Sequence, residues 1–305
     1  MSSIAFQGAV ELGLIYSLVA LGLYLSYRIL DIADLTVDGS FTLGAAVSAV
    51  FTVAGRPFLG LFLSLFAGAL AGFVTAFLQT KLGVQPILAG IITMTALYSI
   101  NLQVMGDKSN VTLLRKETAF TLAEGVFTKD WAKLGVAFLA AAAVSLALIL
   151  FLRTNLGLSV RATGDNRDMV RSSSINTEFT ITVGVGGANA MVALSGALLA
   201  QYQMFSEITV GTGMVIVGLA SLIIGEVITG TKSVPRCVLG AAAGAIIYRL
   251  IMAFALDASV SPQNLKLVSA VVVAAAISWP AVRDQIAFAA IKRRRKAEKS
   301  DADLK

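Results

Sequence analysis

Long apolar runs separated by short polar breaks dominate the chain. A transmembrane helix needs about 20 apolar residues to cross about 30 Å of hydrocarbon. Six runs reach that length, at residues 4–25, 57–79, 131–152, 179–203, 234–256 and 265–282. Three further apolar segments, 39–54, 86–104 and 211–229, are short or are interrupted by Gly, Thr, Asn and Gln. The pattern predicts an all-α, polytopic transmembrane helical bundle of about eight or nine spans, with the three shorter segments partial or re-entrant.

The composition agrees with a membrane protein. Of the 305 residues, 57% are apolar and 14% are charged, a balance that a soluble domain of this length would not tolerate. The runs are too long for the roughly ten-residue alternating strands of an outer-membrane barrel. The first residues, MSSIAFQG, lack the basic segment of a secretory signal. We therefore expect the first run to remain as a span.

Basic residues predict the orientation. If nine segments cross, the loops on one face collect most of the Lys and Arg residues, which marks that face as cytoplasmic. The residues concerned are Arg28, Lys81, Arg153, Arg161, Arg167, Arg171, Lys232, Arg236, Arg283 and the run that starts at Lys292. We expect a multi-pass protein of the bacterial cytoplasmic membrane, with its N-terminus outside and its C-terminus in the cytoplasm.

Two regions follow from this topology. We expect residues 1–285 to form the membrane domain, with a cytoplasmic coupling segment at 161–175, and residues 286–305 to form a basic, disordered cytoplasmic tail. The tail is expected to lie among anionic lipid headgroups. Nucleic-acid binding would require a supporting domain that the sequence does not contain, so we expect membrane lipid and no nucleic acid as its partner.

Two stretches far apart in the chain share a sequence pattern, which we call the inverted echo. IADLTVDGSFTLGAAVSAV begins at Ile32, and FSEITVGTGMVIVGLASLI begins at Phe205. Each places Thr-Val after a full span and opens a short apolar segment with a polar or glycine-rich turn, but the preceding spans run in opposite directions. Interrupted helices in two inverted halves typically mark a transport pathway. The alternative is a chance likeness of two interfacial turns. We expect Asp38 to cap the segment that follows it.

Polar residues within spans extend the set of pathway candidates, because such residues are costly in lipid and usually face a bundle interior or a water-filled path. They are Glu11, Asn101, Gln103, Asn189, Gln201, Glu226 and Arg249. Those near span ends could instead reach the interface, and Asn189 could form an interhelical hydrogen bond. The predicted pathway residues are Thr36, Asp38, Ser40, Asn101, Asn189, Thr209 and Thr212.

The sequence argues against catalysis and against ATP binding by this chain. It has no histidine and one cysteine, Cys237, so metal sites of the His/Cys type and Ser/His or Cys/His catalysis lack their residues. The segment GEVITGTKS, residues 225–233, fails the spacing of a phosphate-binding loop. We expect no enzyme activity, no metal and no bound cofactor. Transport would then require an ion gradient or a separate motor.

The polar stretch RATGDNRDMVRSSSI, residues 161–175, lies between two spans on the cytoplasmic face. We expect it to contain a short helix with Asp165 near the positive end of its dipole and Arg171 near the negative end. Met169 and Val170 would offer a small apolar contact rimmed by charge, which suits docking in a partner's groove. A solvated basic connector is the plain alternative.

With its flanks, this stretch resembles the branched-chain amino acid type permease family of ABC transporters. The family pattern is matched by Arg161, Ala162, Asn166, Ile175 and Asn176, while Val170 stands for an alanine and Ser174 for a glycine. LDIADLTVDGSFTLGAAV is similar to a second family segment, and GDKSNVTLL to an external loop of permeases associated with tryptophan or related aromatic amino acids.

The resemblance implies the membrane subunit of an importer for a small organic solute, with an amino acid as the expected cargo. Two permease chains would form the pathway beside an extracytoplasmic substrate-binding protein and a cytoplasmic ATPase dimer that holds ATP and Mg²⁺. We expect the second chain to be another copy of this one, and a different permease chain is the alternative. Segment 161–175 would transmit the motor's movement, and loop 106–130 would meet the binding protein or cover the pathway. The alternative is an ion-gradient-driven secondary transporter. The implied coupling residues are Arg161, Ala162, Gly164, Asn166, Arg167, Met169 and Arg171.

Overall fold

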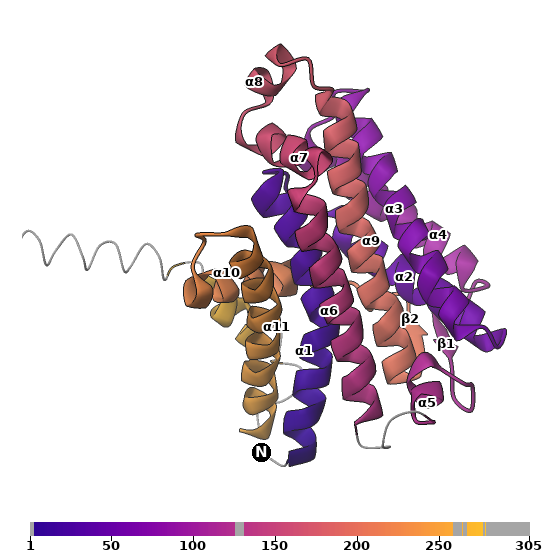
Figure 1. The fold of residues 1–305 in the computed structure, drawn as a ribbon. Helices are drawn as coiled ribbons and strands as arrows, with labels where there is room; N and C mark the ends of the chain where they lie inside the picture. The colour runs from indigo at the N-terminus through magenta and orange to yellow at the C-terminus, as the bar shows by residue number, and fades with distance from the viewer. Residues whose placement is uncertain (1–2, 126–130, 259–263, 265–266, 277, 279–305) are drawn as a thin grey trace, which may run out of the picture.

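The computed structural model describes residues 3–125, 131–258, 264, 267–276 and 278 (Figure 1). The predicted tail, 286–305, lies outside this part. The elements in chain order are α1 (Ser3–Leu23), the π-helix η1 (Tyr24–Ile29), α2 (Thr36–Val53), α3 (Pro57–Thr80), α4 (Pro86–Val104), β1 (Asn110–Thr112), α5 (Ala119–Ala123), α6 (Ala132–Arg153), α7 (Asn155–Asp165), α8 (Arg167–Ser172), α9 (Thr177–Gln203), β2 (Phe205–Glu207), α10 (Met214–Thr229) and α11 (Val234–Asp257).

The structure confirms the polytopic helical bundle. In the described part, seven helical segments are long and apolar enough to cross a membrane: α1 with η1, α2, α3, α4, α6, α9 and α11. Among the three segments expected to be partial, α2 and α4 reach 18 and 19 residues and meet this length, whereas α10 stays short at 16 residues. The expected window 265–282 is described only in part, as a helix over Leu267–Ala276.

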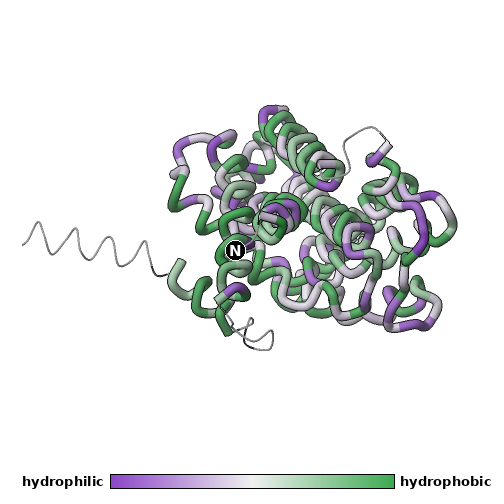
Figure 2. Tube along the Cα trace, turned by 90° about the horizontal axis from the view of Figure 1, so that it is seen from below, coloured by the Kyte–Doolittle hydropathy of each residue, from purple (hydrophilic) through white to green (hydrophobic). Residues whose placement is uncertain are grey.

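The bundle has inner and outer helices. α9, α1 and α2 are 78%, 83% and 72% buried over their most apolar windows, whereas α3, α4 and α6 are 33%, 28% and 22% buried. The inner helix α9 packs against α2, α3 and α1, and α1 packs against α11. The outer helices expose apolar side chains such as Phe62, Phe66 and Leu146. Figure 2 shows hydrophobic positions along the helices and many hydrophilic ones in the loops. The outer faces are therefore the lipid-facing surface.

Small residues allow the inner helices to approach closely. A Cβ atom on Gly44 of α2 would lie 1.9 Å from the carbonyl oxygen of Ala193 in α9. Close backbone contact through small residues is the usual packing mode between membrane helices, because burial away from water does not drive association in lipid. The α2–α9 seam therefore fixes the position of α2.

The two ends of the bundle differ. α7 and α8 lie at one end, which we call the α8 end (Figure 1). β1, β2 and α5 lie at the other, which we call the sheet end, where α1 also begins (Figure 1). β1 pairs antiparallel with β2, with Val111 opposite Ser206. This pairing ties the loop after α4 to the loop before α10, two connections far apart in the sequence.

Candidate pathway and coupling surface

The first half of the candidate pathway is the break between η1 and α2. The chain leaves helical geometry after Ile29 and resumes it at Thr36. The Ser40 hydroxyl, one turn into α2, donates to Asn189 Oδ1 at 2.7 Å. Asn189 is the thirteenth of the 27 residues of α9. α2 therefore begins near the midpoint of the central helix and not at either end of the bundle.

Asn189 also binds a buried carboxylate in this break. Its Nδ2 donates to Asp34 Oδ2 at 2.6 Å, and Asp34 Oδ1 accepts the amide hydrogen of Thr36 at 2.9 Å. Asp34 is 2% exposed and Asn189 is fully buried. A buried acidic group is tolerated only where hydrogen bonds replace its hydration. The Asp34–Asn189–Ser40 network therefore holds the interrupted backbone against α9.

The second half of the candidate pathway is the turn before α10. Gly213, at a φ of 87°, occupies the N-cap position of α10, and its missing side chain leaves the first amides without a local cap. Asp38 supplies the acceptor: its carboxylate accepts hydrogen bonds from the amides of Gly213 at 2.8 Å and Val215 at 2.9 Å. The Thr42 hydroxyl accepts a further bond from the Gly211 amide at 3.2 Å.

The prediction that Asp38 caps its own segment is wrong. α2 begins two residues earlier, at Thr36, where the N-cap residue Leu35 makes no side-chain cap and the first amide is bound by Asp34. Asp38 lies in the first turn of α2, and its carboxylate accepts from the amides at the start of α10, which have no local side-chain cap. The residue joins the two halves of the chain at their interruptions.

Local contacts support the inverted echo. In the first stretch Asp34 accepts from the Thr36 amide, and in the second the Thr209 hydroxyl donates to Glu207 Oε1 at 2.7 Å. Each acidic residue thus binds the threonine two positions later. The environments differ, because the first pair is buried and both Glu207 and Thr209 are exposed.

The remaining candidates do not gather at one site. The Asn101 side chain is buried and donates to the Gly39 carbonyl at 3.2 Å, so it lies near the start of α2. Thr212 and Gln103 are exposed. Gln201 donates to Ser48 Oγ at 2.9 Å and joins α9 to α2. The last three polar residues bind within the bundle: Glu11 accepts from Tyr202, Glu226 pairs with Arg28, and the Arg249 guanidinium lies over the Tyr16 ring.

Sequence reasoning missed Asp34 and Thr75. Thr75 of α3 shares a 2.7 Å hydrogen bond with the Thr36 hydroxyl and is buried. No pattern distinguishes Thr75 from other threonines of apolar helices. The sequence did contain a signal for Asp34, because an acidic residue, Glu207, occupies the same place in the second stretch of the inverted echo.

At the α8 end, three side chains cap three successive helices. Thr154 Oγ1 accepts the Gly157 amide at the start of α7, and Asn166 Oδ1 accepts the Met169 amide at the start of α8. Asn176 Oδ1 accepts the Glu178 amide at the start of α9. Capping residues at these positions each stabilise a helix start by about 1 kcal/mol. They explain why the polar stretch folds as two short helices.

The expected single helix is therefore corrected. Asp165 is the last residue of α7, so it lies at the negative end of a helix and not at the positive end. Asp168 takes the acidic place in the first turn of α8, and Arg171 lies in its last turn as expected. Two helices form in place of the expected one because Asn166 follows the end of α7 and caps the start of α8.

The predicted coupling residues divide by exposure. On α7, Arg161 and Ala162 are half-buried, and Gly164 packs against the chain at η1, where a Cβ atom would lie 1.8 Å from the Ile29 carbonyl oxygen. On α8, Asn166, Arg167 and Arg171 are exposed, and Met169 is 57% exposed. Val170 is buried, so the expected Met169–Val170 contact is reduced to Met169.

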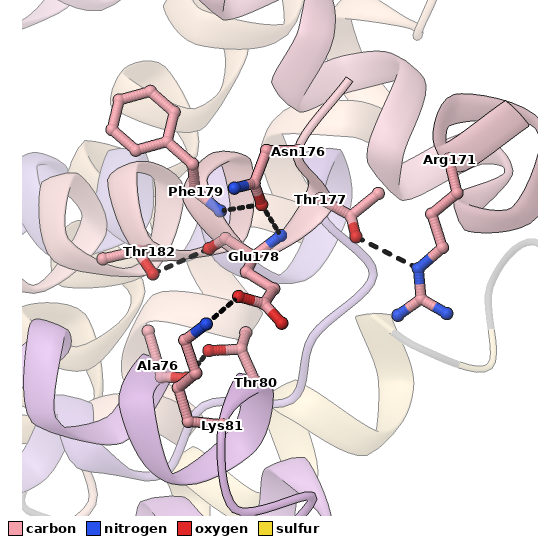
Figure 3. A network of polar contacts seen from close by, with 9 residues as sticks. All are labelled: Ala76, Thr80, Lys81, Arg171, Asn176, Thr177, Glu178, Phe179 and Thr182. Atoms are coloured by element: carbon pink, nitrogen blue, oxygen red, sulfur yellow. Dashed lines mark hydrogen bonds and ion pairs between the residues drawn. The ribbon is translucent and has the colours of Figure 1, made fainter. Parts of the chain in front are cut away.

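Figure 3 shows how α8 is joined to the spans. Arg171 Nε donates to Thr177 Oγ1 at 3.2 Å, which ties the last turn of α8 to the first turn of α9. The next residue, Glu178, forms an ion pair with Lys81 at the end of α3. From Thr177, α9 rises about 18 Å to Asn189. A single rigid helix therefore connects the α8 surface with the network at the α2 break.

The comparisons with known proteins cover nearly the whole chain. A model of the family described as branched-chain amino acid transport system, permease component, matches residues 5–277. A curated relative from Clostridioides difficile (strain R20291), named "Tyrosine transport system permease protein", is 35% identical over 86% of this chain and 86% of its own length. "Uncharacterized protein RP368" of Rickettsia prowazekii (strain Madrid E) is 32% identical over 88% of this chain and 95% of its own length.

One solved structure shares the fold at low identity. "PsaBC from Streptococcus pneumoniae in complex with Fab" has a TM-score of 0.52 and 12% identity, and the match covers 90% of this chain and 91% of that chain. The family model and the curated relatives confirm the resemblance read from the polar stretch and its flanks. The chain therefore belongs to the permease components of branched-chain amino acid type transport systems, and is a membrane transport protein and not an enzyme.

Proposed function

We propose that this chain is the membrane-spanning subunit of an ATP-binding cassette importer for an amino acid in the bacterial cytoplasmic membrane. ATP and Mg²⁺ would be bound by a separate ATPase dimer, and this chain would hold no cofactor. The observation that carries the proposal is the exposed α8 surface, defined as Arg167, Met169 and Arg171, and its connection through Thr177 to the central helix.

The α8 surface suits a protein partner. Met169 is an exposed apolar side chain on a short helix that also exposes Arg167, Asp168 and Arg171. A protruding helix of this kind docks in a groove of the opposite charge, with the apolar residue as anchor. Because Arg171 is bonded to Thr177, a displacement of α8 would be transmitted to α9. This is the property that a motor-driven permease requires.

We place the α8 end in the cytoplasm and the sheet end outside. The α8 end carries Arg153, Arg167 and Arg171 on exposed positions, as the cytoplasmic face of a membrane protein does. Exposed Leu114 beside β1 and the paired strands form a firm outer surface for an extracytoplasmic binding protein. The N-terminus is then outside and the C-terminus cytoplasmic.

Two copies of the chain would enclose the pathway. Within one copy, Thr36, Ser40 and Asn189 bind residues of neighbouring helices of the same bundle, so they line no open channel in the described part. A path between two copies would be opened by movement of α2 and α10, which meet at Asp38. The cargo proposed is an aromatic amino acid, supported by the name of the Clostridioides difficile relative.

The decisive experiment is purification of the tagged chain from its native membrane in mild detergent, with mass spectrometry of the bound proteins. We expect stoichiometric recovery of an ATPase, and tyrosine- and binding-protein-stimulated ATP hydrolysis after reconstitution in liposomes. Recovery of the chain without an ATPase would contradict the proposal. ATP hydrolysis that responds to leucine and not to tyrosine would support the importer and identify leucine as the cargo in place of tyrosine.

The buried Asp34 favours a second candidate, an ion-gradient-driven transporter. Such proteins use an acidic residue at mid-membrane, and Asp34 binds the midpoint residue of α9. Liposomes that contain only this chain distinguish the two mechanisms. Uptake driven by a proton or sodium gradient without ATP would support the second candidate, whereas uptake that requires ATP and the ATPase would exclude it.

A further inference from the structure

An apolar groove runs along the lateral surface of the bundle between α6 and the helices α3 and α9. It encloses about 530 Å³. α6 packs mainly along α1 and touches α9 little, which leaves the space open. Its walls carry Leu65 of α3, Ala143, Ala147 and Phe151 of α6, and Gly187 and Met191 of α9.

The groove opens toward the lipid. Ala143 and Ala147 on its α6 wall are exposed, and α6 is the least buried of the seven spanning segments of the described part. Its lining side chains are all apolar, so ordered water would find no side-chain hydrogen-bond partner in it. Since α3, α6 and α9 are all long and apolar enough to cross the membrane, the groove lies at the level of the hydrocarbon core.

The dimensions match one leaflet. Along α9 the lining extends from Val183 to Leu194, which is about 16 Å at the rise of an α-helix. Half of a hydrocarbon core of about 30 Å is about 15 Å. The groove begins near the α8 end, because Phe151 lies two residues before the end of α6. An acyl chain that enters from the leaflet at the α8 end would fill it.

A cation marks the level of the headgroup. Arg153, the last residue of α6, is exposed two residues beyond Phe151. Arginine at the end of a spanning helix binds lipid phosphate through charge-assisted hydrogen bonds. We propose that the groove is a phospholipid site, in which one acyl chain lies between α6 and α9 and the phosphate lies at the level of Arg153.

Such a lipid would act on the coupling region. α6 continues through Thr154 into α7, and α7 is bonded to α9 by a 2.8 Å hydrogen bond between Thr163 and Thr180. Along the groove, the acyl chain keeps α6 apart from α9. Beyond the groove, the Thr163–Thr180 hydrogen bond joins α7, which continues α6, to α9. The lipid would therefore stabilise the position of α6 next to the connection that carries α7 and α8.

The first test uses the unaltered protein. Reconstitution with a phosphatidylglycerol that carries a diazirine near the middle of one acyl chain, followed by illumination and peptide mapping, reports what lies in the groove. We expect labelling concentrated on the α6 and α9 residues that line it, above the level on the exposed faces of α3 and α4. Labelling spread evenly over all exposed faces would overturn the proposal. So would the absence of labelling on the α6 and α9 residues that line the groove.

A matched pair of variants provides the second test. Ala147→Leu fills the groove, whereas Ala142→Leu makes the same change at an exposed position of α6 outside it. Gly187→Leu fills it from α9, where a Cβ atom would meet only Leu25, at 3.5 Å.

Native mass spectrometry after delipidation should show one retained phospholipid in the wild type and in Ala142→Leu, and at least a tenfold loss in both filling variants. Equal retention in Ala147→Leu and Ala142→Leu would refute the site. Loss of folding in one filling variant leaves the other to decide, and the labelling of the wild type is independent of both.

Discussion

Asp38 Oδ2 lies 2.8 Å from the Gly213 amide nitrogen, so an acidic residue in the first half of the chain caps a helix in the second half. The contact joins the two interrupted segments directly. α2 and α10 meet at few other places, whereas α10 packs extensively on α11 and α1. Any movement that separates α2 from α10 must therefore break this cap, and any movement that keeps it must move both together.

Asp38→Leu removes the acceptor of both the Gly213 and the Val215 amides. We expect transport to be lost and the free energy of unfolding to fall by about 1–2 kcal/mol, the usual worth of a helix cap. Asp38→Asn keeps an acceptor oxygen and should retain part of both. Uptake in liposomes and thermal unfolding in detergent measure the two effects. Unchanged uptake in Asp38→Leu would show that the junction has no part in transport.

Asn189→Leu should be the most damaging substitution of the candidate pathway. It leaves the Asp34 carboxylate and the Ser40 hydroxyl without their partner in the bundle interior, at a cost of about 3–5 kcal/mol. We expect little folded protein on size-exclusion chromatography. The exchange of Asp34→Asn with Asn189→Asp restores one amide and one carboxylate to the pair, and should recover folding in part. Failure of the exchange together with tolerance of Asn189→Leu would contradict the network.

Patterning predicted the spans and the polar stretch because both follow from the contrast between apolar and polar residues. It placed the first interruption at Asp38 and Gly39, a few residues after the break that the structure shows between Ile29 and Thr36. Patterning could not predict which amides the Asp38 carboxylate binds. These amides belong to Gly213 and Val215, which are far away in sequence, and only the tertiary fold brings them to α2. Local capping rules assume a partner within three residues.

The coupling segment shows the same limit. The residue types predicted a surface helix, but Asn166 allows either one helix interrupted by a polar residue or two helices with a cap between them. The structure has two: Asn166 caps α8, and Gly164 lets α7 pack closely against Ile29. The same packing buries Val170, which the pattern placed on the outer surface with Met169.

Arg167→Glu combined with Met169→Ser should abolish transport and substrate-stimulated ATP hydrolysis, because it reverses the charge and removes the apolar anchor of the α8 surface. Both side chains are exposed, so unfolding temperatures should stay near the wild-type value. The control is Leu114→Ser with Arg115→Glu, an equivalent pair exposed at the sheet end, in which the ATPase should remain bound. Normal ATPase recovery with the α8 variant would refute docking there.

The Arg171–Thr177 hydrogen bond should affect transmission more than docking. Arg171→Ala and Thr177→Val each remove this hydrogen bond, which should lower the free energy of unfolding by about 0.5–1.5 kcal/mol. In Thr177→Val the α8 surface is unchanged, so the ATPase should bind normally while its hydrolysis responds less to substrate. A double-mutant cycle on uptake should show a coupling energy between the two residues. Strictly additive losses would mean that the bond transmits nothing.

Ser174 tests whether a departure from the family pattern has a conformational basis. It has a φ of 60°, in the left-handed region, at the place where the family pattern has glycine. Glycine adopts this region freely, whereas a β-branched residue meets strain of about 1–2 kcal/mol. We therefore expect Ser174→Gly to keep transport and unfolding temperature at or above the wild-type values, and Ser174→Val to lower the unfolding temperature and weaken ATPase binding, because the turn sets where α8 meets α9. Ser172→Val, at an exposed position at the end of α8 with no positive φ, is the matched control and should have a smaller effect. If Ser174→Val unfolds at the wild-type temperature, the turn relaxes out of the left-handed region without cost, and the glycine of the family pattern has another cause.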